Sequence, residues 1–90
     1  MIYLRRVYGN SMLPTLKPGN IVLAAKKRHI KTNDLIIAKI NNKEVVKRVK
    51  TIEKDGSLYL LGDNLSQSTD SRTYGFICKQ NVIGVVKVIL

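Results

Sequence analysis

The shortness of every apolar run is the feature that most constrains how this 90-residue chain can fold. The longest unbroken run is Ile21–Ala25, and turn-forming residues interrupt the chain at intervals of about 8–12 residues, as in all-β domains. No segment has the periodicity of an amphipathic helix. The sequence therefore predicts a single all-β domain over residues 1–90, a compact sheet or partly closed barrel with little or no helix.

The turn signals divide the chain into short expected strands. Lys17-Pro18-Gly19-Asn20 is typical of a turn, because Pro presets φ while Gly and Asn tolerate positive φ. Asn41-Asn42-Lys43 indicates a hairpin connection, and Lys54-Asp55-Gly56-Ser57 indicates another turn. The strands are expected at 2–8, 21–25, 34–40, 44–53, 58–61 and 82–90.

Cysteine and histidine are too scarce for several kinds of chemistry. Cys78 is the only cysteine, so the chain has no internal disulfide, and we expect this residue to be a small buried or half-buried filler. With one histidine and no Cys-x-x-Cys pair, the sequence contains no metal-ligand cluster. We therefore expect no metal and no cofactor.

No segment has the pattern of a membrane span or a signal peptide. A span needs about 20 apolar residues, and a signal peptide needs an apolar core of about 7–15 residues near its start. Residues 1–8 contain two arginines instead. We expect a soluble protein, located in the cytoplasm or held peripherally at a membrane.

The charge balance favours an anionic partner. Sixteen Lys and Arg face six Asp and Glu, a formal net charge of +10, which suits nucleic acid, acidic lipid or an acidic protein. The densest basic run, 26–31, is either a solvated loop between strands or a docking segment for an acidic membrane surface or an acidic protein. Few aromatic residues and no recognition-helix pattern argue against nucleic acid.

Three blocks carry the candidate chemistry. Residues 9–16 read Gly-Asn-Ser-Met-Leu-Pro-Thr-Leu, residues 45–49 read Val-Val-Lys-Arg-Val, and residues 62–75 read Gly-Asp-Asn-Leu-Ser-Gln-Ser-Thr-Asp-Ser-Arg-Thr-Tyr-Gly. A serine hydroxyl is a poor nucleophile until a neighbouring base takes its proton, and a lysine can be that base. Serine with lysine is the one nucleophile–base pairing that these blocks offer.

Ser11 is the candidate nucleophile and Lys47 the candidate base. Gly9 permits unusual backbone angles before Ser11 and Pro14 stiffens the chain after it, although a turn serine that caps its own backbone would have the same neighbours. Side chains alternate along a strand, so Lys47 shares a face with valines. Burial there would lower its pKa and leave a neutral amine. A solvent-facing Lys47 and the use of Lys50 instead are the alternatives.

In this order the blocks resemble the type I signal peptidase family of serine peptidases, over roughly residues 8–84. The resemblance implies the all-β fold of that catalytic core, without an inserted second domain, and a Ser11–Lys47 dyad. It also matches Ser68 with a serine that hydrogen-bonds the lysine amine. Capping of the loop is the alternative role for this serine.

The same resemblance gives structural roles to the long loop. The family's equivalents of Asp63 and Asp70 pair with arginines, and the candidates here are Arg48 for Asp63 and Arg72 for Asp70. These four residues and Asn64 would hold the loop in shape rather than transfer protons.

An oxyanion needs preorganised N–H donors. The backbone N–H of Ser11 is the first candidate. Gly9 stands where some family members place a serine hydroxyl, so a second donor is expected from backbone, at Gly9, or from another side chain. Asn20 replaces the aspartate that usually follows Gly19 in the family, and we interpret this as a structural replacement in a turn.

The function that the resemblance implies is that of a serine endopeptidase. It would bind a protein or peptide substrate as an added, extended strand and remove a leader or a propeptide. Small members of the family include maturation peptidases for nickel superoxide dismutase. Two alternatives stay open. One is a self-cleaving domain of the SOS-repressor type, which lacks the long third block and would need a small cleavable pair before Ser11. The other is a catalytically silent basic binding module.

Overall fold

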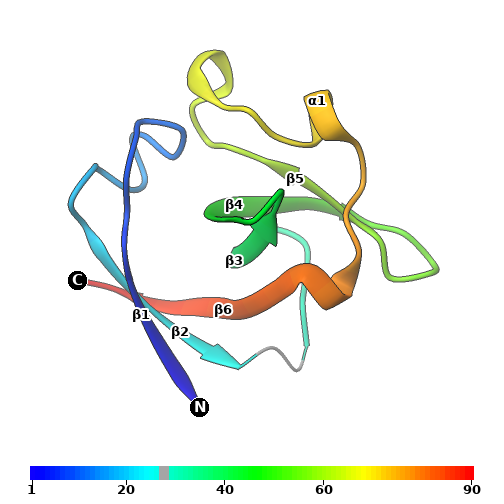
Figure 1. The fold of residues 1–90 in the computed structure, drawn as a ribbon, viewed down its shortest axis with the longest axis horizontal. Coiled ribbons are helices and arrows are strands. Elements are labelled where there is room, and N and C mark those ends of the chain that lie inside the picture. Colours follow the sequence, from blue (N-terminus) through cyan, green and yellow to red (C-terminus); the bar gives the residue numbers. More distant parts are fainter. Residues whose placement is uncertain (27–28) are drawn as a thin grey trace.

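Six strands form one antiparallel sheet in the computed structural model, which describes residues 1–26 and 29–90 (Figure 1). The strands are β1 (Ile2–Arg6), β2 (Ile21–Lys26), β3 (Leu35–Ile40), β4 (Lys43–Ile52), β5 (Leu58–Leu61) and β6 (Val82–Ile89). Their order across the sheet is β1-β2-β6-β3-β4-β5, and every neighbouring pair is antiparallel. Because β1 and β5 are separate ends of this order, the sheet is not closed. Strands dominate the described structure, so the predicted all-β class is confirmed.

The turns form where the sequence predicts them. Asn41 and Asn42 have φ values of 51° and 64° and join β3 to β4, as the common two-residue hairpin turn requires. Lys43 begins β4, so the connection is one residue shorter than expected. The side-chain oxygen of Asn20 accepts a hydrogen bond from the Lys17 N–H at 2.8 Å, which gives this asparagine a structural role in its turn.

The curled sheet buries apolar side chains on both of its faces. Adjacent β3 residues belong to different clusters: Ile36 packs with Val49 and Leu60, whereas Ile37 packs with Val22. Burial on both faces explains why β3 is a continuous apolar run rather than an alternating one. The register shifts in three pairings, β2 with β6, β3 with β6 and β4 with β5, and such irregularities bend strands and increase their twist.

Three one-turn helical segments lie between β5 and β6: η1 (Leu65–Gln67), α1 (Ser71–Tyr74) and η2 (Lys79–Asn81). They are too short to leave a helical period in the sequence. In the described part of the chain, no helix reaches the length and apolar character needed to cross a membrane.

The prediction that Cys78 is a buried filler is wrong, because its side chain is exposed. Ile77 pairs with Leu58 and points into the core, so its neighbour Cys78 faces the opposite side. The basic run at 26–31 cannot be assessed as a whole, since residues 27 and 28 lie outside the described part of the chain.

Candidate active site

Ser11 lies in the segment between β1 and β2 and is half-buried. Gly9 has a φ of 74°, a left-handed value that side chains disfavour, so the chain bends sharply just before the serine. The buried side chains of Met12 and Leu16 anchor the segment in the core after it. The hydroxyl is therefore carried by an irregular backbone that is held on both sides.

Lys47 is one of the few buried polar residues among those described, with 4% of its surface exposed. It shares a face of β4 with fully buried Val49, as strand alternation predicts, whereas Lys50 is exposed. Burial lowers the pKa of Lys47, Asp70 opposes this by attraction, and the positive charge of Arg72 lowers the pKa further. The net direction is downward, which favours the neutral amine that a general base needs.

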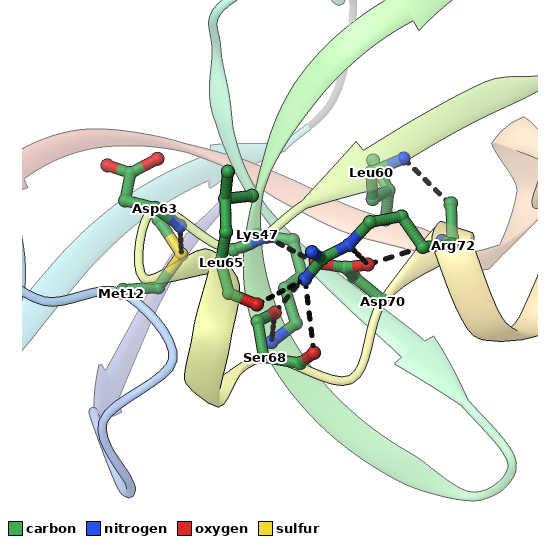
Figure 2. Close-up of polar contacts among 10 residues, drawn as sticks. Met12, Lys47, Leu60, Asp63, Leu65, Ser68, Asp70 and Arg72 are labelled. Carbon is green, nitrogen blue, oxygen red and sulfur yellow. Dashed lines mark hydrogen bonds and ion pairs between the residues drawn. The ribbon is translucent and has the colours of Figure 1, made fainter.

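A chain of hydrogen bonds connects Lys47 to the loop at 62–75 (Figure 2). Lys47 Nζ donates to Ser68 Oγ at 3.2 Å, and Ser68 Oγ donates to Asp70 Oδ2 at 2.8 Å. Arg72 Nε donates to Asp70 Oδ1 at 2.9 Å, and Arg72 Nη2 donates to the Leu65 carbonyl at 2.7 Å. The loop residues thus fix the hydroxyl that the lysine amine contacts.

Asp70 is fully buried and anchors this arrangement. Burial opposes its ionisation, but hydrogen bonds from Arg72, the Gly62 N–H and Ser68 outweigh that effect and lower the pKa of Asp70 to about 2. It also caps α1 by accepting from the Arg72 N–H. The carboxylate is therefore ionised at neutral pH and can only accept hydrogen bonds.

Asp63 forms the second predicted pair, with Arg48 of β4. Its two oxygens accept from Arg48 at 2.7 and 3.1 Å, and one of them also accepts from the Thr15 hydroxyl at 2.5 Å. The hydrogen bond from Arg48, helped by that from Thr15, lowers the pKa of Asp63 despite partial burial. Asp63 therefore ties β4 and the long loop to the serine segment, a role for Thr15 that the sequence analysis missed.

The long loop also contacts the backbone of the serine segment directly. The Ser11 carbonyl accepts from the Asn64 N–H at 2.8 Å, and the Asn64 side chain donates to the Asn10 carbonyl at 3.1 Å. A Cβ at Gly62 would lie 2.1 Å from Ser68 Oγ and 2.6 Å from the Ser11 carbonyl oxygen. Only glycine fits there, a requirement that sequence reasoning missed because it depends on the approach of distant segments.

Ser11 and Lys47 line one pocket of about 120 Å³. Most of the other lining residues are aliphatic, and Val7, Met12 and Val45 are among them. A serine and a lysine of lowered pKa thus line the same small space. Such an arrangement can perform nucleophilic attack assisted by a general base.

The comparison with protein families identifies the class of protein. The model of the family described as Peptidase S24-like matches residues 1–87, almost the whole chain. The comparison with curated proteins gave no match. The family supports the expected kinship with serine peptidases and self-cleaving domains, but not the signal peptidase subtype in particular. By this match, the chain belongs to the Peptidase S24-like family.

Proposed function

We propose that this chain is a serine endopeptidase in which Ser11 is the nucleophile and Lys47 the general base, and that it removes a leader or a propeptide from a protein substrate. One observation carries the proposal: Lys47 is buried, its amine contacts Ser68, and the residue lines the same pocket as Ser11. The membership of the Peptidase S24-like family supports the same class of chemistry.

The hydrogen bonds orient the amine for this reaction. Ser68 donates its hydroxyl hydrogen bond to ionised Asp70 and so accepts one from Lys47. A neutral Lys47 keeps its lone pair for the Ser11 proton. Ser11 Oγ then attacks the peptide carbonyl carbon, and the C–N bond breaks as the lysine gives the proton to the leaving amine. Water, deprotonated by the same lysine, hydrolyses the acyl-enzyme. Backbone N–H groups of Ser11 and Gly9 are the proposed oxyanion donors.

Two strand edges offer a place for an extended substrate. β5 pairs with β4 only over residues 48–52, so the edge of β4 at 43–47 that faces away from β3 has no strand partner among the described residues. Among the strands that the structure describes, β1 has a neighbour on its β2 side alone. A peptide strand between these edges would gain backbone hydrogen bonds. The small volume of the pocket beside Ser11 favours a small side chain near the cut.

The structure favours cleavage of another molecule over cleavage of residues 2–6 of this chain. These residues form β1, and they pair in register with β2. Their backbone is therefore held in the sheet on the β2 side, as a wall of the site rather than as a substrate strand within it. The self-cleaving alternative, which the family also supports, would need a different segment in the site.

A burst assay tests the proposal. Wild-type protein mixed with p-nitrophenyl acetate should release a stoichiometric burst of nitrophenol as Ser11 is acylated, and peptide mapping should find the acetyl group on Ser11. A peptide library should then identify a cleaved sequence. A protein that gives no burst and cleaves no peptide would support the silent binding module instead.

A further inference from the structure

An ion pair connects β1 to β4, two strands that are not neighbours in the sheet. Arg5 Nε lies 2.5 Å from Glu44 Oε1, and Arg5 Nη2 lies 3.3 Å from Oε2. Three strands, β2, β6 and β3, separate the partners in the sheet order. The pair therefore bridges the open side of the curled sheet and joins two strands that do not hydrogen-bond to each other.

Arg5 makes further contacts besides the ion pair, and these hold its side chain in place. Arg5 Nη1 donates to the Leu4 carbonyl at 3.0 Å, and the guanidinium lies 5.7 Å from the centre of the Tyr3 ring. The hydrogen bond from Arg5 lowers the pKa of Glu44, and the reciprocal bond raises the pKa of Arg5. Both shifts favour the charged forms, and each partner has 38% of its side-chain surface exposed.

This pair lies next to the candidate site, in the lining of the pockets that begin there. Beside the pocket at Ser11 lies a second one of about 290 Å³, to which Arg5 contributes. The residues that line both pockets come from the end of β1, the segment just after it and the first half of β4. They are Arg6, Tyr8, Glu44, Val45 and Val46. The two pockets therefore form one groove between the edges of β1 and β4.

Strand spacing indicates what this groove admits. Neighbouring strands lie about 4.8 Å apart, so two edges that receive one strand between them are about 9.6 Å apart. Arginine and glutamate are long enough together to meet across such an opening, and short or branched side chains are not. We infer that the Arg5–Glu44 pair is a strut that holds the edges of β1 and β4 at the separation required by one extended peptide strand.

The strut is a positioning device for substrate, and it rests on the proposed peptidase function. It makes no contact with the reacting atoms. It restricts the groove to a single extended, unstructured segment and excludes a helix, whose diameter with side chains is about 10–12 Å. Loss of the strut should therefore weaken peptide binding more than it slows the chemistry at Ser11.

A peptide substrate and an ester substrate distinguish binding in the groove from the chemistry at Ser11. Glu44→Gln should raise KM for a fluorogenic peptide chosen from the library by about threefold to fivefold, the range expected for a half-exposed pair, with kcat little changed. Glu44 also lines the pocket at Ser11, so the burst with p-nitrophenyl acetate, which does not need the groove, should slow, but by less than peptide binding weakens. The charge swap Arg5→Glu with Glu44→Arg should recover part of the lost peptide affinity. Glu53→Gln, at an exposed position after β4, is the matched control and should change neither value.

The outcomes are distinct. An unchanged peptide KM in Glu44→Gln would overturn the strut. So would an equal fall of the peptide and ester reactions, because that result indicates general damage to the site. A swap no better than the single variants would overturn the pairing as the cause. A wild-type protein that neither cleaves peptide nor gives a burst would contradict the proposed function, and the strut with it.

Discussion

The Nζ atom of Lys47 lies 3.2 Å from the hydroxyl oxygen of Ser68, and this contact determines where the lysine can direct its lone pair. The Ser68 hydroxyl has a single proton, and it directs this proton at Asp70 in a hydrogen bond. It can therefore only accept from the lysine. The amine is held by a neighbour that neither takes its proton nor carries a charge, so its lowered pKa is preserved.

The dyad predicts that Ser11→Ala and Lys47→Ala each lower kcat/KM for the library peptide by at least about a thousandfold. The double variant should be no slower than either single one, because the two residues act as a unit. Circular dichroism should show an unchanged fold, and Lys47→Met, which fills the same space, is the control for a cavity at Lys47. Substantial cleavage by Ser11→Ala would contradict the assignment.

The pH profile follows from the pKa of Lys47. Burial lowers this pKa, so the neutral and active form should appear below the ordinary lysine value of about 10.4, and activity should rise with pH through that lower ionisation. Asp70 raises the pKa of Lys47, so Asp70→Asn should move the rise to still lower pH. NMR titration of labelled lysine measures this directly, and a Lys47 amine that titrates near its ordinary value would refute the burial argument.

The two aspartates should differ in their effect on stability. Asp70 is fully buried, so Asp70→Asn should approach the loss of about 3–5 kcal/mol of a broken buried pair, reduced by the solvent that reaches Arg72. The Asp63 carboxylate is partly exposed, so Asp63→Asn should cost less, about 1 kcal/mol. Both should lower the melting temperature and the activity together. Activity lost at an unchanged melting temperature would indicate a direct catalytic role instead.

Acid should weaken the same anchor. The pKa of Asp70 is about 2 in the folded protein and about 3.9 in an unfolded chain. Its stabilising contribution is therefore complete above the unfolded value and is lost as the pH falls through about 2. In chemical denaturation from pH 5 downward, Asp70→Asn should remove part of the acid sensitivity of the wild-type protein, whereas Asp55→Asn, in an exposed turn, should remove less.

Gly62 should not tolerate a side chain. Gly62→Ala places a Cβ against Ser68 and the Ser11 carbonyl, so the long loop and the serine segment must separate, at a cost of about 1–3 kcal/mol. Activity should fall more than stability alone explains. Gly56→Ala is the control: its φ of 90° strains the turn, but nothing lies within 4 Å of the added carbon. Equal activity in the two variants at equal stability would argue against the close approach.

Tyr74 carries a hydroxyl whose removal should stabilise the protein. Its oxygen is buried without a hydrogen-bond partner among the described residues, and burial raises its pKa to about 12. Tyr74→Phe keeps the packing and removes the unsatisfied group, so the free energy of unfolding should increase by about 1 kcal/mol. Thermal denaturation measures the change, and a lower melting temperature would mean that the hydroxyl has a partner in solution.

Local chemistry made much of this fold predictable from the sequence. The paired asparagines at 41–42 adopt positive φ, and the apolar runs become strands close to their expected bounds. Alternation along β4 was sufficient to predict that Lys47 shares a buried face with valines. These features depend on a residue and its near neighbours, so they can be inferred without knowing the rest of the structure.

Tertiary structure alone decided which distant segments meet. The order β2-β6-β3 places the last strand in the middle of the sheet, and no local pattern predicts it. Three further features depend on that order and its register. They are the exposure of Cys78, the glycine requirement at position 62 and the ion pair between Arg5 and Glu44. The sequence indicated which residues are able to do chemistry. Only long-range strand pairing could bring Ser11 and Lys47 to one pocket, because contacts between distant segments form through the packing of the whole sheet.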